Sequence, residues 1–533
     1  SRPLMNARSV AVEPKTALAA RARRLMQSAA AYPFVTSDVE VIETHISYVY
    51  LTDRFVFKLK KPVRYEFLDF STAEARRQAC CEEVRLNRRL ARDIYLDVVP
   101  ITVDDGHFHL GGDGKPVDWL VKMRRLPADR AMDELIRRGE LTEAHVGPVA
   151  KTLANFYQQA PPVSLRCESY RQAIAQHVRA NHLELSREVH QLPEPMIRRV
   201  WQAQQRVLQL WPDLLTTRVC DGRIVDGHGD LRPEHIYLAP SPTVIDCIEF
   251  NSDFRQIDVL DELCFLDMEC VRLGAEWVGD KILAHYRTTC RDEPPEALRN
   301  FYRCYRACVR AKVCALRADQ LTNHRADEAI NEAAEYLHLA DRYAADFARP
   351  LMLVVCGASG TGKSTVAAPL SQELGFVWLQ TDAIRREMFG VSETPPQLNK
   401  GHYTTDKRQA VYNRMFDRAD ALLADGLSVI LDGSFVSGEH RQAAAELARR
   451  RDVDLRFLWC DCPEPVASSR IQSRMAEGGS ASEATSAIHH FHQASADWDF
   501  AGLPFTAIDT TQSLPDITER VFAAVRQAAR CPE

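Results

Sequence analysis

The stretch LMLVVCGASGTGKST, residues Leu351–Thr365, decides the fold of the C-terminal part of this chain. Its first six residues are apolar and run directly into a glycine-rich segment, which is the pattern of a buried strand that enters a phosphate-binding loop. The loop fits G-x-x-x-x-G-K-[ST], and a helix is expected to open at Thr365. The residues predicted to surround nucleotide phosphates are Gly357, Ala358, Ser359, Gly360, Thr361, Gly362, Lys363, Ser364 and Thr365.

The chemistry of this loop follows from its residue types. Glycines allow successive backbone N–H groups to point at the phosphates, and Lys363 is expected to reach the β- and γ-phosphates. The hydroxyl group of Ser364 is expected to bind Mg²⁺. A glycine-rich turn without a ligand is the alternative, but strand, loop, Lys-Ser pair and helix together favour a nucleotide site.

Two acidic residues end later apolar runs in the same part of the chain. Asp382 ends the run in GFVWLQTD and precedes Arg385, so it is a candidate to take the proton of an acceptor hydroxyl while nearby arginines hold the substrate. Asp432 ends the run in LSVILD and is a candidate to hold Mg²⁺ through water or to orient the acceptor. Each acid has a structural alternative, since Asp residues also cap helices.

Arg470 and Arg474 lie four residues apart in SSRIQSR, and therefore on one helical face that is expected to close over the transferring phosphate. An exposed, solvated face is the alternative. Together these residues resemble the P-loop small-molecule kinases, which include gluconate kinase, chloramphenicol phosphotransferase and the zeta-toxin sugar-nucleotide kinases. The resemblance implies a parallel sheet with helices on both faces, the acceptor carboxylate Asp382 and a lid that carries the two arginines.

The segment HGDLRPEH, residues His228–His235, is a second signature. It resembles the catalytic loop of the aminoglycoside phosphotransferase group, which shares the protein-kinase fold and includes choline and homoserine kinases. The resemblance implies that Asp230 takes the acceptor proton, that His235 binds metal, and that Asp246 in TVIDCIEFN is the metal-binding Asp. The family pattern carries Asn where this chain has His235. A His nitrogen suits softer metals, so Mn²⁺ is the alternative to Mg²⁺ at this site.

The segment VEVIETHISYVYLTDRFVFKLKKP alternates as a hairpin does and is expected to turn at Asp53–Arg54. Its second strand brings Lys58 and Lys60 onto one face. The resemblance implies that one of these lysines pairs with ATP phosphates; Lys58 fits best and Lys60 is its rival. The predicted helix AEARRQACCEEVRLNRRL offers Glu83 as the ion-pair partner, with Glu82 as the second choice and a solvated charged surface as the alternative.

Composition describes a globular protein. The 533 residues are enough for two or three domains, and 46% of them are hydrophobic and 26% charged. The net charge of −6 gives no overall attraction to nucleic acid or anionic membranes, and the sequence has no run of 18 apolar residues, so neither partner is expected. The fifteen cysteines do not read as a disulfide scaffold and the N-terminus has no signal-peptide core, so we expect reduced thiols and a cytoplasmic location.

These features predict a multidomain chain in three parts. Residues 1–31 form a helical extension, and residues 349–533 form the α/β phosphate-loop domain. Between them lies an α+β domain that resembles the protein-kinase fold, with a small lobe at about 32–127 and a helical lobe at about 128–348.

Two phosphoryl-transfer sites in one chain predict a bifunctional ATP-dependent kinase, with GTP as the alternative nucleotide. Its partner is a small molecule that offers a hydroxyl group: a sugar, a sugar nucleotide, an amino alcohol or an antibiotic. The alternative is one active kinase domain regulated by a nucleotide-sensing second domain that is weakly active or inactive.

Overall fold

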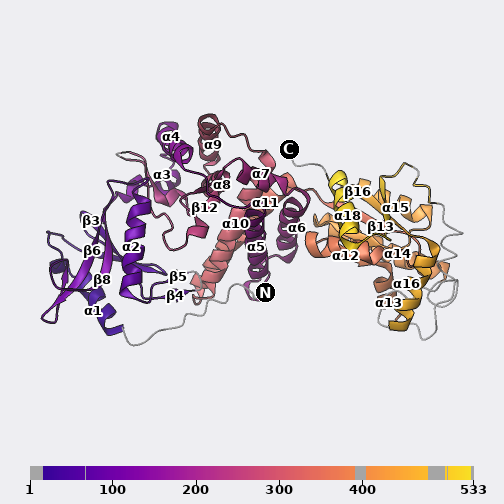
Figure 1. Cartoon of the computed structure of the whole chain (residues 1–533), viewed down its shortest axis with the longest axis horizontal. Coiled ribbons are helices and arrows are strands. Elements are labelled where there is room, and N and C mark those ends of the chain that lie inside the picture. Colours follow the sequence, from indigo (N-terminus) through magenta and orange to yellow (C-terminus); the bar gives the residue numbers. More distant parts are fainter. Residues whose placement is uncertain are drawn as a thin grey trace. The chain divides into compact units, whose positions relative to one another are not determined.

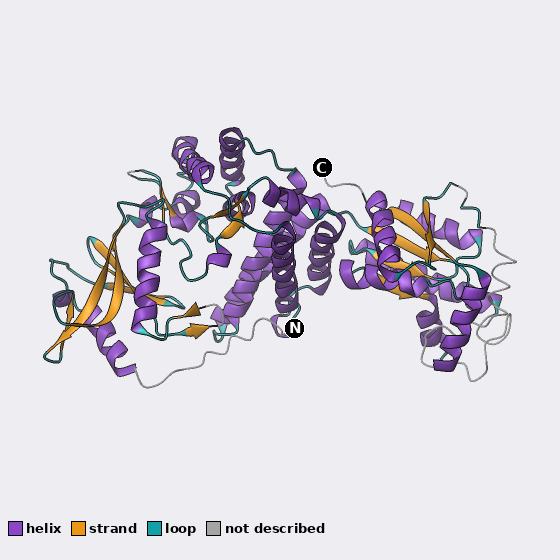
Figure 2. Ribbon diagram, viewed as in Figure 1, coloured by secondary structure: helices purple, strands orange, loops and turns teal. Residues whose placement is uncertain are grey.

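The computed structural model describes residues 16–65, 68–239, 241–390, 404–477, 498–500 and 502–529. The chain divides into two compact units, whose elements are shown in Figures 1 and 2. The first unit combines residues 1–166 with 217–294, and the second combines residues 167–216 with 295–533. The sequence-based boundary between residues 348 and 349 falls inside the second unit and stays a prediction.

A six-stranded antiparallel sheet forms the N-terminal part of the first unit, with strand order β1-β2-β3-β8-β6-β7. Its strands are β1 (Glu40–Glu43), β2 (Ser47–Leu51), β3 (Phe55–Lys60), β6 (Tyr95–Asp104), β7 (His107–Leu110) and β8 (Lys115–Arg124). Strands β2 and β3 form the predicted hairpin, which turns over residues 52–54.

Helices cover both faces of this sheet. On one face, Phe57 and Leu59 of β3 are buried together with residues of α1 (Thr16–Met26). On the other face, α2 (Ala73–Asn87) packs against β8 and β6. Because side chains alternate along a strand, the two lysines of β3, which alternate with Phe57 and Leu59, lie on the α2 side.

The remainder of the first unit is mostly helical. Its elements are β4 (Arg64–Tyr65), β5 (Leu68–Asp69), α3 (Met132–Arg137), α4 (Glu143–Gln159), β9 (Ile224–Asp226), β10 (Ile236–Tyr237), β11 (Thr243–Val244), β12 (Gln256–Asp258), α8 (Val259–Arg272) and α9 (Glu276–Cys290), while α7 (Asp213–Cys220) crosses the division between the units. A buried ion-pair network fixes the start of α8: Arg218 contacts Asp258 through two bonds of 2.8 Å and also contacts Asp292 at 2.6 Å.

The second unit contains a five-stranded parallel sheet of order β14-β15-β13-β16-β17, which confirms the predicted α/β fold. Its strands are β13 (Leu351–Cys356), β14 (Val377–Gln380), β15 (Val429–Asp432), β16 (Asp454–Asp461) and β17 (Phe505–Asp509). Helices cover both faces: α12 (Lys363–Leu374) and α18 (Leu514–Ala528) on one, and α13 (Thr381–Phe389), α14 (Thr405–Ala424) and α15 (Gly438–Arg450) on the other; α16 (Glu464–Glu477) follows β16.

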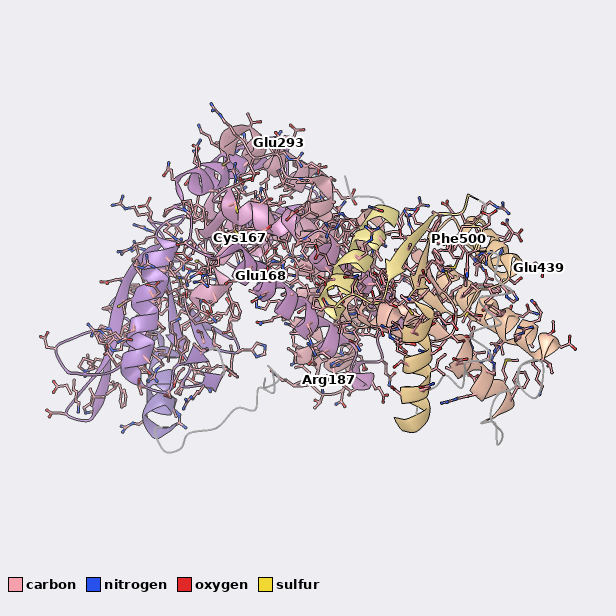
Figure 3. All side chains as sticks on the ribbon, turned by 45° about the vertical axis from the view of Figure 1, so that its right-hand side comes forward. Cys167, Glu168, Arg187, Glu293, Glu439 and Phe500 are labelled. Carbon is pink, nitrogen blue, oxygen red and sulfur yellow. The ribbon has the colours of Figure 1, made fainter. Side chains whose placement is uncertain are left out.

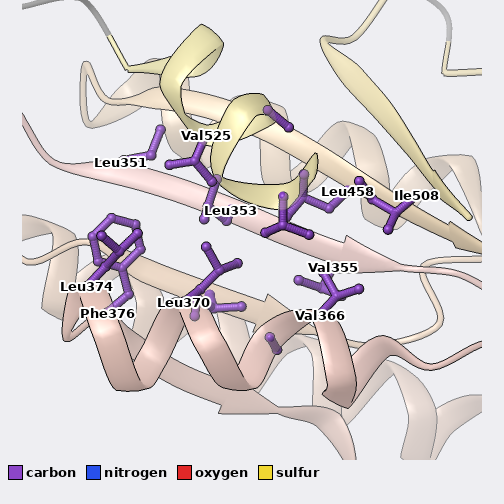
Figure 4. Packing of buried hydrophobic residues seen from close by; sticks show 14 of the residues in the cluster. Leu351, Leu353, Val355, Val366, Leu370, Leu374, Phe376, Leu458, Ile508 and Val525 are labelled. Carbon is purple, nitrogen blue, oxygen red and sulfur yellow. The ribbon is translucent and has the colours of Figure 1, made fainter. Parts of the chain in front are cut away.

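Every residue of β13 is buried, which explains why this strand reads as an unbroken apolar run. Leu351, Leu353 and Val355 pack with residues of α12 and α18 (Figure 4). The alternate residues of the strand pack with α13, α14 and α15 on the opposite face. The strand thus delivers its C-terminal end, and the phosphate loop that follows, from the centre of the sheet.

Four long helices of the second unit come from the predicted helical lobe, namely α5 (Cys167–Leu185), α6 (Glu194–Leu210), α10 (Glu296–Ala318) and α11 (His324–Phe347). Helix α6 contacts the sheet at the end opposite to the phosphate loop. The side chain of Gln202 accepts a hydrogen bond from the N–H of Ser428 at 2.8 Å and donates one to the carbonyl oxygen of Gly375 at 2.9 Å. Leu210 joins the core cluster of β13, so α6 packs directly on the phosphate-loop fold.

Two general expectations can be compared with the described part of the chain. Within it, the helices fall short of the combination of length and apolar composition that a membrane crossing requires. The cysteines in the same ranges form no disulfide bonds with one another.

Candidate functional site

The phosphate loop connects the end of β13 to the start of α12. Gly357, Gly360 and Gly362 have φ angles of 141°, 84° and 83°, which residues with a side chain rarely adopt. Helix α12 begins at Lys363, so the prediction that it opens at Thr365 is wrong by two residues. The reason is that Gly362, in the left-handed conformation, already serves as the N-cap.

The loop also lies too close to neighbouring backbone to admit side chains. A Cβ atom on Gly357 would overlap the carbonyl oxygen of Cys460, and one on Gly360 would lie 2.7 Å from the carbonyl oxygen of Ala467. The ammonium group of Lys363 donates to the carbonyl oxygen of Ala358 at 2.9 Å and thus curls back over the loop. This arrangement is a compact cradle suited to phosphate groups.

Arg470 of α16 lies beside the cradle. Its guanidinium donates to the hydroxyl of Thr510 at 3.0 Å and to the carbonyl oxygen of the same residue at 2.7 Å. The hydroxyl of Thr510 in turn donates to the carbonyl oxygen of Thr361 in the loop at 2.8 Å. Arg474 belongs to the same helix, but its side chain lies outside the part of the chain that the structure describes.

Asp432 lies at the end of β15, next to β13 and β14. Its carboxylate accepts a hydrogen bond from the indole N–H of Trp378 at 3.2 Å. Burial raises the pKa of Asp432 to about 6, against the positive charge of Lys363 and with a further contribution from the negative charge of Asp382. The three residues are therefore close enough to influence one another at one edge of the sheet.

Asp382 lies in the first turn of α13 and forms an ion pair with Arg385. The N-cap of this helix is Gln380 and makes no side-chain capping bond. The alternative that Asp382 merely caps its helix is therefore wrong. Its carboxylate remains within the electrostatic reach of Asp432.

Tyr412 of α14 is a residue of this region that the sequence did not indicate. Its hydroxyl accepts a hydrogen bond from the N–H of Phe435 at 2.9 Å, and its ring stacks on His440 with 3.8 Å between ring centres. The carbonyl oxygen of Ser434 accepts a bond from the N–H of Gly357 at 3.2 Å. Tyr412 thus lies behind a turn that touches the phosphate loop, and no motif surrounds it that would have revealed this.

Arg441 of α15 holds the same turn from the other side. It is only 2% exposed and donates to the carbonyl oxygen of Phe435 at 2.7 Å and to that of Asp499 at 3.0 Å. Its guanidinium lies 5.4 Å from the ring centre of Phe500, which is labelled in Figure 3. A buried arginine bonded to carbonyl oxygens fixes backbone rather than substrate.

In the first unit, Lys58 of β3 lies between two carboxylates. Its ammonium nitrogen is 3.0 Å from Oε1 of Glu83 in α2 and 2.7 Å from Oδ1 of Asp246. Glu82, the second choice, pairs instead with Arg85. Burial acts to lower the pKa of Lys58, but the charges of Asp246 and Glu83 outweigh it and raise that pKa well above its ordinary value.

Lys60 lies deeper than Lys58. The Lys60 side chain has no exposed surface, whereas that of Lys58 is 12% exposed. The Lys60 ammonium is 2.6 Å from Oε2 of Glu83 and also pairs with Glu249. Each carboxylate oxygen of Glu83 therefore lies within ion-pair distance of one lysine.

The HGD segment places Asp230 beside Arg232 and His235. Nε of Arg232 is 3.0 Å from Oδ1 of Asp230. Nδ1 of His235 is 2.9 Å from the carbonyl oxygen of Asp230, and its Nε2 is 3.7 Å from Oδ2 of Asp246. Because a carbonyl oxygen can only accept, Nδ1 carries a proton, and Nε2 lies 3.4 Å from Nη2 of Arg232. Burial acts to raise the pKa of Asp230, but the nearby positive charges, that of Arg232 first, together outweigh it and lower that pKa.

Glu262 of α8 supports the HGD segment from behind. It accepts hydrogen bonds from the N–H of His228 at 2.9 Å, from the N–H of Gly229, and from the hydroxyl of Tyr157 at 2.6 Å. A Cβ atom on Gly227 would lie 2.6 Å from the Glu262 carboxylate. The backbone of this segment is therefore fixed by one buried acid.

Asp246 has a φ angle of 64°, a left-handed conformation that is unusual for a residue other than glycine. Its N–H donates to the hydroxyl of Tyr95 at 3.1 Å, and the N–H of Cys247 donates to the side chain of Asn87 at 2.9 Å. Strained backbone that its surroundings hold in place is a feature of functional sites.

Both regions have donors that fit a divalent cation. The two lysines of β3 pair with three carboxylates, so the cluster holds one more carboxylate than ammonium groups. Asp246 and Nε2 of His235 provide a mixed oxygen and nitrogen donor set. In the second unit, Asp432 and the hydroxyl of Ser364, in the first turn of α12, provide the oxygen donors that Mg²⁺ prefers.

Comparison with known sequences supports the C-terminal assignment. A family described as "AAA domain" matches residues 352–497. The chain is 33% identical over 470 residues to the uncharacterized protein Rv2004c of Mycobacterium tuberculosis, and the match covers 86% of this chain and 91% of that protein. A cytidylate kinase of Natronomonas pharaonis is 29% identical over 129 residues, which is 23% of this chain and 58% of that enzyme.

Among solved structures, a gluconokinase from Sinorhizobium meliloti is similar at 21% identity, with a TM-score of 0.26. The similarity covers 34% of this chain and 95% of that one.

Proposed function

The chain belongs to the same family as the uncharacterized protein Rv2004c of Mycobacterium tuberculosis, and we propose that it is an ATP-dependent kinase with two nucleotide sites. The phosphate loop carries this proposal, because its cradle ends at Lys363 while Asp382 and Asp432 follow neighbouring strands at the same edge of the sheet. Open α/β sheets bind ligands at the carboxyl ends of their strands. The matches to an AAA domain and to a cytidylate kinase support a kinase.

At the phosphate-loop site, Lys363 and the arginines of α16 would neutralise the charge of the transferring phosphoryl group. Asp382 would take the proton of the acceptor hydroxyl as that oxygen attacks the γ-phosphorus. Ser364 and Asp432 would hold Mg²⁺, which neutralises phosphate charge when it is bound.

At the first site, the proposed roles follow the resemblance to aminoglycoside phosphotransferases. Lys58 would bind the phosphates of ATP, Asp230 would take the acceptor proton, and Asp246 and His235 would hold Mg²⁺ or Mn²⁺. The meeting of β3, α2, the HGD segment and the Asp246 loop in one buried cluster supports these roles.

The acceptor proposed for the chain is a small molecule with a hydroxyl group: a sugar, a sugar nucleotide, an amino alcohol or an antibiotic. At the phosphate-loop site, Asp382 lies in the electrostatic neighbourhood of Tyr412, a buried residue whose ring stacks on His440.

ATP consumption tests this function. It would be measured across sugars, nucleosides, sugar nucleotides, amino alcohols and aminoglycosides for the wild type, Lys363→Ala and Asp230→Asn. We expect an acceptor-dependent activity that Lys363→Ala lowers by about 100-fold or more. The exposed lysine of α4 provides the matched control Lys151→Ala, which should behave as the wild type. Turnover that survives Lys363→Ala and Asp230→Asn together would exclude both sites.

A regulatory first unit is the second candidate. It is favoured by the ion pair of Arg232 with Asp230, which engages the carboxylate that would take the acceptor proton. In that case Asp382→Asn removes turnover while Asp230→Asn leaves it intact, and a nucleotide in the first unit changes the kcat/KM of the second. Two separable losses would instead support a bifunctional enzyme.

A further inference from the structure

A second buried lysine accompanies the one that is proposed to bind ATP. Lys60 has no exposed surface and lies on the same face of β3 as Lys58. Its ammonium contacts Oε2 of Glu83 at 2.6 Å, pairs with Glu249, and lies 5.1 Å from the ring centre of Phe70. These surroundings leave Lys60 enclosed by protein.

The partners of the two lysines form a chain of contacts. Glu83 of α2 forms an ion pair with Lys58 through one oxygen and accepts a hydrogen bond from Lys60 on the other. Asp246 accepts Lys58, and Glu249, three residues further along the same loop, accepts Lys60. Helix α2 and the Asp246 loop are therefore joined twice through β3, once by each lysine.

The Lys58–Asp246 contact and the Lys60–Glu249 contact are expected to respond differently to a nucleotide. Phosphate oxygens and a divalent cation would compete for Lys58 and Asp246 respectively, so the contact between these two residues has to open. Lys60 and Glu249 lie too deep to meet the phosphates, and their contact can persist. With Lys60 on Oε2, Glu83 stays in place when Lys58 turns toward a phosphate.

We infer that Lys60 and Glu249 act as positioning residues that hold Glu83 and the Asp246 loop in place, so that Lys58 alone is available to the phosphates of ATP. This inference rests on the proposed nucleotide site of the first unit. Without Lys60, the buried carboxylates of Glu83 and Glu249 would lose their shared cation, and their rearrangement would displace Lys58 from the position in which it meets the phosphates.

Nucleotide binding to the full-length Lys363→Ala protein tests the inference, because that background weakens the second site. The probes are ATP and adenosine, with affinities measured by calorimetry. Lys60→Met should weaken ATP binding by about tenfold, the loss expected for one charge-assisted contact. Adenosine affinity should stay unchanged, because adenosine has no phosphate for Lys58 to contact. A residue with a merely structural role would alter both affinities alike.

Two further variants make the result decisive. Lys61→Met is the matched control, since Lys61 is the next residue along the chain and pairs with Glu43 instead. The double variant Lys60→Met/Glu249→Gln removes both charges of the buried pair and guards against a folding defect, which thermal unfolding would reveal. It should show the same selective loss of ATP affinity.

The possible outcomes separate this inference from the proposed function. Equal loss of ATP and adenosine affinity, or no loss of either in a folded double variant, would overturn the positioning role. Failure of the Lys363→Ala parent to bind ATP or adenosine at all would instead overturn the nucleotide site of the first unit.

Discussion

Protonation of the single residue Asp432 is expected to make Mg²⁺ binding in the second unit depend on pH. Burial raises the pKa of Asp432 to about 6, so below that pH the folded protein holds the group protonated and without charge. We expect the affinity for Mg²⁺ to fall by about tenfold for each pH unit below 6. Calorimetric titration of Mg²⁺ with ADP present measures this, in the Asp246→Asn variant that disables the proposed first metal site.

Two variants check the assignment to Asp432. Trp378→Phe removes a hydrogen-bond donor that favours the charged carboxylate, so it should move the midpoint to higher pH. Asp461→Asn, at the exposed end of β16, should leave the midpoint in place. A constant Mg²⁺ affinity across the range would contradict a metal-binding role for Asp432.

The raised pKa of Asp432 also makes the stability of the folded protein depend on pH. The carboxyl group of Asp432 binds its proton more tightly in the folded than in the unfolded chain. Its contribution therefore favours the folded state at low pH and is lost as the pH rises through about 6.

The site residues that could be predicted from the sequence are those that belong to contiguous motifs. It left Lys58 and Lys60 as rivals, because alternation places both on one face and does not say which one lies deeper. It did not indicate Tyr412 or Thr510, since neither stands in a motif and each reaches the phosphate loop only through the fold of distant segments.

Helix α8 supports the HGD segment through Glu262. Glu262→Gln keeps the shape but removes the charge that three donors share. We expect it to lower the free energy of unfolding of the first unit by roughly 2 kcal/mol and to reduce any activity that depends on Asp230. Urea unfolding and the ATP-consumption assay measure the two effects.

The control for this prediction is Glu143→Gln. Glu143 pairs with Lys281 on the surface with 77% of its side chain exposed, so its loss should leave the free energy of unfolding nearly unchanged. If Glu262→Gln proved equally mild, the HGD segment would have to be held by other contacts.

Element boundaries followed the sequence where apolar periodicity was strong. The hairpin of β2 and β3 and the strand β13 agree with their predicted patterns. The start of α12 did not, because a glycine with positive φ can cap a helix and the motif alone does not show where helical hydrogen bonding begins.

At the scale of the whole molecule, the phosphate-loop fold depends on α6. Gln202→Ala would leave the N–H of Ser428 and the carbonyl oxygen of Gly375 without this partner. We expect a loss of about 1–3 kcal/mol in the stability of the second unit, seen as a lower Tm that ATP raises again. Arg198→Ala, which breaks an exposed pair on the same helix, is the control and should leave Tm nearly unchanged. Equal Tm values for both variants would show that α6 contributes nothing through Gln202.

The division of the chain into units could not be predicted from the sequence. An amphipathic pattern shows that one face of a helix is buried but not which partner buries it. Residues 167–216 and 295–348 were therefore assigned with the HGD segment by their position along the chain. The contacts group these residues in one compact unit with the phosphate-loop fold, and the predicted domain boundary stays a prediction.

Glu83 pairs with two lysines at once, and this limits how far α2 can move. Outward movement of α2 would break two buried ion pairs at once and leave buried charges without partners, which is costly. Regulation of the first unit by rotation of α2 is therefore not expected. We therefore expect α2 to form a fixed wall of the proposed nucleotide site, with the same position before and after a nucleotide binds.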